Sequence, residues 1–168
     1  HRDDLTIDES VYLSIVERKT ASLIATCCEV GAMLVCDEPE IRSAMHRFGL
    51  NLGVAFQITD DLLDLTGEQF EVGKSVGRDL DVGTLTLPFI RALQQSDEDD
   101  RRTLSALVRD RCHAQLRQRL RDEGWVDSAL DTARELVKTA RLQLEPLPDN
   151  AATSTLHRIA DGVIDRKF

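Results

Sequence analysis

The chain has 168 residues and a formal net charge of −9 at pH 7, which argues against nucleic acid or an anionic membrane surface as its main partner. The length suits one domain, residues 1–168, and the scarcity of aromatic and proline residues favours an all-helical fold. Since no signal peptide or membrane-spanning apolar run is recognisable, we expect a cytoplasmic protein in which Cys27 and Cys36 are reduced, buried hydrophobes.

The first predicted helix covers about residues 10–35. Lys19 falls on its apolar stripe, between Val16 and Leu23. A buried ammonium group is costly unless it meets an anion or extends into solvent, and this helix alone leaves both interpretations open. The predicted stripe consists of Tyr12, Val16, Leu23, Cys27, Val30 and Leu34.

The second predicted helix, residues 40–65, places Gln57, Asp60, Asp61 and Asp64 on one face. The residues before them are apolar enough to be core, so a cluster of like charges sits on a helix that otherwise looks buried. Such a cluster needs a cation, and hard oxygen ligands at this spacing suit Mg²⁺. The alternative is a solvated acidic face. Gly49 and Gly53, four residues apart, predict that another helix approaches closely.

A loop over residues 67–80 brings Gly73-Lys74 and Asp79 after the carboxylates. Acids on a helix followed by a loop with a lysine are the parts of a metal–diphosphate site, in which lysine adds a point charge. The stretch from Gly67 to Ser75 is not a P-loop, because it has five residues between its glycines and a helix precedes it. An EF-hand is excluded as well, because the positions after Asp60 and Asp64 lack the alternating oxygen ligands that its loop requires.

Four more helices are expected over residues 81–95, 96–121, 126–144 and 151–165. The acidic run from Asp97 to Asp100 opens the second of these. Acids in the first turn complement the helix dipole, which is enough to explain them. This run therefore does not predict a second metal site.

The motifs Phe56-Gln57-x-x-Asp60-Asp61-x-x-Asp64, Gly73-Lys74, Gly77-x-Asp79-Leu80 and Gly83-x-Leu85-Thr86-Leu87-Pro88 resemble the second aspartate-rich region of the trans-isoprenyl (polyprenyl) diphosphate synthases. Upstream, Glu17-Arg18-Lys19-Thr20-Ala21 is similar to the lysine–threonine helix of that family. The resemblance runs from about Tyr12 to Leu93 and more weakly to Lys167. It implies an all-α, isoprenoid-synthase-type helical bundle, of which this chain is the C-terminal portion.

The resemblance also implies a reaction. An allylic diphosphate ionises, isopentenyl diphosphate attacks the allylic cation, and a longer polyprenyl diphosphate forms. Asp60, Asp61 and Asp64 would hold Mg²⁺, Lys19 and Lys74 would contact diphosphate oxygens, and Thr20 and Gln57 would lie near the cation. By the same resemblance, a basic end of the chain such as Arg166 closes over substrate phosphate.

The first aspartate-rich motif of that family is missing from this chain, because Asp3-Asp4 has the wrong spacing. We therefore expect the C-terminal half of a synthase, inactive alone, that forms a homodimer or associates with the missing N-terminal half. Two alternatives stay open: a non-catalytic partner subunit of a polyprenyl synthase, and a class I terpene cyclase with a similar metal cluster.

Overall fold

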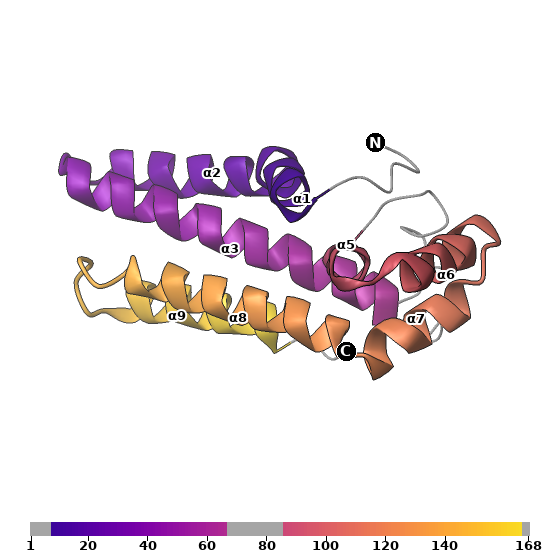
Figure 1. Ribbon diagram of the computed structural model, residues 1–168. Coiled ribbons are helices and arrows are strands. Elements are labelled where there is room, and N and C mark those ends of the chain that lie inside the picture. The colour runs from indigo at the N-terminus through magenta and orange to yellow at the C-terminus, as the bar shows by residue number, and fades with distance from the viewer. Residues whose placement is uncertain (1–7, 67–85, 166–168) are drawn as a thin grey trace. The chain divides into compact units, whose positions relative to one another are not determined.

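The computed structural model describes residues 8–66 and 86–165, and all the regular structure in these two ranges is helical (Figure 1). The prediction of an all-α protein is confirmed. None of the helices in these ranges is long and apolar enough to cross a membrane. The elements are α1 (Glu9–Val16), a π-helical segment η1 (Glu17–Ala21), α2 (Ser22–Met33), α3 (Pro39–Thr66), α5 (Leu87–Gln95), α6 (Glu98–Arg109), α7 (His113–Asp122), α8 (Trp125–Leu142) and α9 (Ala151–Ile164).

The contacts of the chain gather into two compact units. Among the described residues, the first unit comprises residues 8–12, 60–66 and 86–130, and the second comprises residues 13–59 and 131–165. The expectation that residues 1–168 form one domain stays a prediction.

In the second unit, α2 packs closely along α3 through the two glycines singled out by the sequence (Figure 1). A Cβ atom on Gly49 would lie 2.7 Å from Cα of Ala25, and one on Gly53 would lie 2.6 Å from Cα of Ala21. Real Cβ atoms do not come this near to a neighbouring backbone, so only glycine permits the observed spacing. The predicted close approach of a helix is confirmed.

The first predicted helix forms, but η1 interrupts it and changes which side chains are buried. The Ser22 N–H donates to the Glu17 carbonyl, five residues back, which adds one residue to that turn. Tyr12 and Val16 are buried as predicted, and the buried residues that follow are Ala21, Ala25 and Ala32.

The second half of the predicted stripe is therefore wrong, because the extra residue turns all later positions by about 100°. Leu23, Val30 and Leu34 are 68%, 46% and 80% exposed. Cys27 is exposed and Cys36 is partly exposed, so the prediction that both are buried is also wrong. We call Leu23, Cys27, Val30 and Leu34 the outer stripe.

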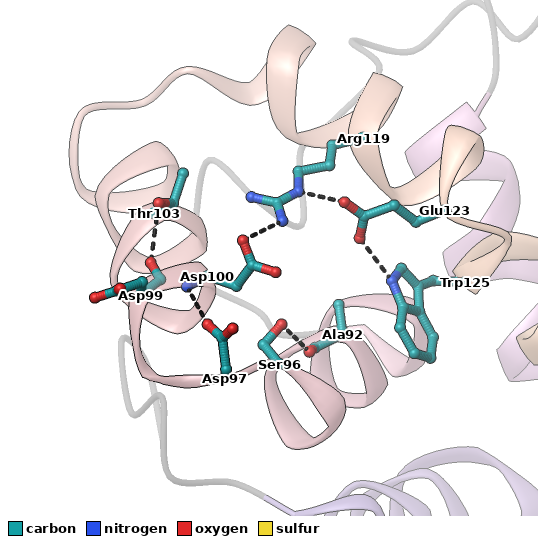
Figure 2. Close-up of polar contacts among 9 residues, drawn as sticks. All are labelled: Ala92, Ser96, Asp97, Asp99, Asp100, Thr103, Arg119, Glu123 and Trp125. Carbon is teal, nitrogen blue, oxygen red and sulfur yellow. Dashed lines mark hydrogen bonds and ion pairs between the residues drawn. The ribbon is translucent and has the colours of Figure 1, made fainter.

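In the first unit, the acidic run at the start of α6 is accounted for by local interactions (Figure 2). The Asp97 side chain caps the helix by accepting from the Asp100 N–H at 2.9 Å. Asp100 pairs with Arg119 of α7 at 3.0 Å, and Arg119 also pairs with Glu123. The interpretation of this run as a helix start is supported by these contacts.

The predicted helix over residues 96–121 is two helices in the structure. α6 ends at Arg109, and Arg111 takes a left-handed backbone with φ 55° before α7 begins at His113. No glycine or proline marks this break, so the periodicity of the sequence did not reveal it. Gly124, with φ 79°, ends α7 as predicted. Helix α5 begins later than predicted, at Leu87, after Thr86 in an extended conformation.

Candidate functional site

The predicted site residues that the structure describes lie on two helical stretches. Lys19 and Thr20 belong to η1, while Gln57, Asp60, Asp61 and Asp64 belong to α3. Lys74 and Arg166 lie outside the described residues, as do Gly73 and Asp79.

In the second unit, η1 and α3 bring together two motifs that are far apart in the sequence. The Thr20 hydroxyl donates to the Gln57 side-chain carbonyl at 2.7 Å, across 37 positions of sequence. Gly49, Gly53 and Gln57 recur every four residues on α3 and meet Ala25, Ala21 and Thr20 in turn. The two glycines thus bring the backbones close enough for the hydrogen bond to form.

Lys19 is exposed on η1, next to Thr20. The inserted residue of the π-helical turn removes Lys19 from the buried stripe on which the sequence placed it. Isolated π-helical turns are rare and occur often at functional sites. Because the Lys19 side chain is exposed, both interpretations stay open, since its ammonium group is accessible to solvent and to an anion alike.

In the first unit, the three carboxylates of the motif occupy the last turns of α3 and differ in their surroundings. Asp60 is exposed, Asp64 is partly buried, and Asp61 is 8% exposed. The Tyr12 hydroxyl donates to Oδ2 of Asp61 at 2.7 Å. The apolar stripe in the sequence predicts that Tyr12 is buried, but nothing in that pattern indicates which group its hydroxyl would bind.

Arg121 of α7 donates to the carbonyl of Thr66, the last residue of α3. A helix leaves its last carbonyl groups without partners inside the helix, and this contact satisfies one of them. It also fixes the end of the helix that carries the carboxylates. Arg121 was not singled out by the sequence, where it is one arginine among several in α7.

The donor set of α3 fits Mg²⁺ by its chemistry, since three carboxylates supply hard oxygen ligands. Within residues 8–66 and 86–165, no three His, Cys, Asp or Glu side chains gather closely enough to hold a metal ion by themselves. Mg²⁺ is usually held by one or two carboxylates together with substrate phosphates, and such a site does not require a cage made of protein alone.

A groove of about 650 Å³ lies in the second unit between α8 and α9, apart from the residues named so far. Its charged lining includes Arg134, Lys138, Arg141, Glu145, Asp161 and Asp165. Arg141 and Asp161 pair at 2.8 Å, and the mixture of signs gives little net attraction for a diphosphate. The groove is therefore not the predicted diphosphate site.

Cysteine chemistry is not supported at Cys28. Burial raises the pKa of its thiol, and the neighbouring Cys27 raises it further. A raised pKa keeps the thiol protonated at neutral pH, whereas the nucleophilic form is the thiolate.

Comparison with known proteins gives consistent results. The chain is 36% identical over 176 aligned residues to the geranylfarnesyl diphosphate synthase of Natronomonas pharaonis. This match covers 100% of this chain and 48% of that protein. It is 32% identical to the heptaprenyl diphosphate synthase component 2 of Bacillus subtilis, over 94% of this chain and 45% of that protein. The chain thus spans about half the length of the curated relatives it matches.

A solved structure of polyprenyl synthase from Caulobacter crescentus, complexed with calcium and isoprenyl diphosphate, matches with a TM-score of 0.90. The identity is 31%, and the match covers 99% of this chain and 52% of that one. The polyprenyl synthetase family model matches residues 1–122. On this match, and on the helical fold that it shares with these synthases, the chain belongs to the polyprenyl synthetase family.

Proposed function

We propose that this chain provides one half of the active site of a prenyl diphosphate synthase, which condenses an allylic diphosphate with isopentenyl diphosphate. Family membership and the names of the relatives support a prenyltransferase. The observation that carries the proposal is the Thr20–Gln57 hydrogen bond, because it joins the lysine–threonine motif to the helix of the aspartate motif.

The proposed roles follow from the chemistry of each side chain. Asp60, the most exposed of the three carboxylates, would hold Mg²⁺ directly, and Asp61 and Asp64 would do so directly or through water. Magnesium, when bound, would stabilise the negative charge of the departing diphosphate. The calcium and isoprenyl diphosphate in the Caulobacter crescentus structure support a divalent cation and a prenyl diphosphate as ligands.

Lys19 would place a positive charge against the diphosphate oxygens, and its exposure leaves its ammonium group accessible to a ligand. The dipoles of Thr20 and Gln57 would lie near the allylic cation as the carbon–oxygen bond breaks. Preorganised dipoles of this kind are often the largest contribution to catalysis. Lys74 and Arg166 keep their proposed roles at the diphosphate as predictions.

The remainder of a complete synthase is the proposed partner of the outer stripe. Leu23 of α2 and Leu34, the residue that caps the end of α2, are large apolar side chains with 68% and 80% of their surface exposed. An exposed apolar row of this kind marks an interaction surface. The match covers only about half the length of the relatives. The segment that corresponds to their unmatched half is therefore the partner that we propose.

To test the reaction, the chain is produced together with the N-terminal half of a polyprenyl synthase, and condensation is assayed with Mg²⁺. Asp60→Asn should lower kcat at least about a hundredfold, since removal of a group that stabilises transition-state charge has effects of this size. The matched control is Asp99→Asn in the acidic run of α6, which should leave the rate unchanged.

The other outcomes separate the alternatives. Full activity of the Asp60→Asn complex would contradict the proposal and indicate a non-catalytic partner subunit. Cyclic products from a single diphosphate would indicate a class I terpene cyclase.

The interface is tested by co-purification. Replacing Leu23 and Val30 with asparagine should abolish capture of the N-terminal half, whereas Ile159→Asn, an equally apolar exposed site on α9, should not. If the Leu23 and Val30 replacements abolish self-association of this chain but leave capture of the N-terminal half unchanged, the outer stripe is instead a homodimer interface.

A further inference from the structure

The hydrogen bond from Tyr12 to Asp61 concerns two buried groups that lie 49 positions apart in the sequence. Tyr12 is 5% exposed and Asp61 is 8% exposed, and both belong to the first unit. The oxygen–oxygen distance of 2.7 Å is the usual one for a hydroxyl donor, so the bond is well formed.

A carboxylate oxygen that is removed from water needs a hydrogen-bond donor in its place. The Tyr12 hydroxyl supplies one to Oδ2 of Asp61. Because a tyrosine side chain has few rotatable bonds and this ring is packed in the core, the hydroxyl is held in one place.

We infer that Tyr12 is a positioning residue for the proposed reaction: it fixes the orientation of the Asp61 carboxylate, so that the cation and diphosphate meet a rigid ligand set. This inference rests on the proposed function. Tyr12 would act only through Asp61 and would not touch the substrate. Partners of this type, one step removed from the metal, commonly change metal affinity or activity 10- to 100-fold when they are replaced.

The first experiment uses the fact that Tyr12 is the single tyrosine of the chain. This chain is labelled with fluorotyrosine and assembled with an unlabelled N-terminal half. The assembled synthase then gives one fluorine NMR resonance, that of residue 12. The probe is Mg²⁺ with inorganic pyrophosphate. The resonance should shift and saturate as they bind, whereas sodium chloride of the same ionic strength should not move it.

The second experiment compares Tyr12→Phe with the wild type in the assembled synthase. The variant keeps the ring and loses only the hydroxyl. The Mg²⁺ concentration for half-maximal binding of pyrophosphate, measured by calorimetry, should rise about tenfold, and kcat should fall by a similar factor. Val137→Ala, a buried residue of α8, serves as a control for a general loss of stability and should leave the Mg²⁺ dependence unchanged.

The failures are distinguishable. If the wild type binds Mg²⁺ and pyrophosphate and turns over, but Tyr12→Phe has the same Mg²⁺ dependence or the fluorine resonance does not move, the positioning role is wrong and the proposed function stands. If the assembled wild type neither binds pyrophosphate nor condenses substrates, the proposed function is wrong and the inference fails with it.

Discussion

Gly53 of α3 lies so close to Ala21 of η1 that a Cβ atom built on it would be 2.6 Å from the Ala21 Cα and 2.9 Å from its Cβ. Four residues further along α3, Gln57 accepts the hydrogen bond from Thr20, the residue before Ala21. The separation of the two backbones at Gly53 therefore sets the length of the bond between the two motifs.

Gly53→Ala should destabilise the chain by about 1–3 kcal/mol, the usual cost of overpacking. The nearest atom, the Ala21 Cα, belongs to the backbone and cannot move aside cheaply. Urea denaturation measures the change. The matched control is Gly31→Ala on α2, where a Cβ would meet nothing within 4 Å, and it should stabilise the chain by about 0.5–1 kcal/mol through helix propensity. Equal effects at the two glycines would show that the close contact is not formed.

Thr20→Val removes one hydroxyl while keeping the shape of the side chain. The Gln57 side chain would lose this 2.7 Å bond, so kcat of the assembled synthase should fall about tenfold, the effect of a loss of about 1.4 kcal/mol. Steady-state kinetics measures it. Thr26→Val on α2 is the control, since the Thr26 hydroxyl donates within its own helix, to the Ser22 carbonyl. An undiminished kcat for Thr20→Val would remove Thr20 from the proposed machinery.

Arg91 of α5 ties three helices of the first unit together. It donates twice to Glu9 of α1, at 3.0 and 2.6 Å, and twice to Ser128 of α8, at 2.7 and 2.9 Å. The Arg91 side chain is 14% exposed and the Glu9 side chain 32%, so this ion pair is partly buried. Arg91→Met would therefore leave the Glu9 carboxylate partly buried without the guanidinium group.

We expect Arg91→Met to cost about 1.5–3 kcal/mol in urea denaturation, the range for hydrogen bonds that involve charged groups. The control is Arg102→Met on α6. The Arg102 side chain is 72% exposed and pairs with Glu98 and Asp99, which lie within one turn of it on the same helix. That change should stay within about 0.5 kcal/mol. A cost for Arg91→Met no larger than that of the control would mean that the cross-helix bonds are not made.

Glu123 gives the chain an acid-dependent contribution to stability (Figure 2). Partial burial raises its pKa, but hydrogen bonds from Arg119 and Trp125 outweigh this and hold the pKa below its ordinary value of 4.5. Because the folded pKa is the lower one, the stabilisation is fully present above pH 4.5 and is lost as the pH falls through the folded pKa.

Trp125 is the only tryptophan and donates to Glu123 at 2.9 Å, so its fluorescence reports on this carboxylate. In the wild type, emission should change with a midpoint below pH 4.5, and Glu123→Gln should remove that transition. Asp122→Asn, which changes a neighbouring exposed carboxylate, should leave it in place. A midpoint above 4.5 would contradict the lowered pKa.

The sequence by itself determined the helical class, most helix ends and the family. The end of α7 at Gly124 and the close packing at Gly49 and Gly53 were predictable because glycine has a backbone freedom and a small size that no other residue shares. The helix-start character of the acids from Asp97 to Asp100 followed from dipole and capping rules, which act over a single turn.

Only the tertiary structure decided which side of the α1–η1–α2 stretch is buried, where α6 ends, and what Tyr12 contacts. A π-helical turn and a left-handed Arg111 have no local signal in the residue types present, so periodicity carried past them gives the wrong face or the wrong length. Tyr12 and Asp61 meet across 49 positions, and a bond between groups so far apart depends on how the helices pack. Local sequence patterns reflect interactions within one or two helical turns. Which groups meet in a buried contact depends instead on how all the helices of a unit pack together.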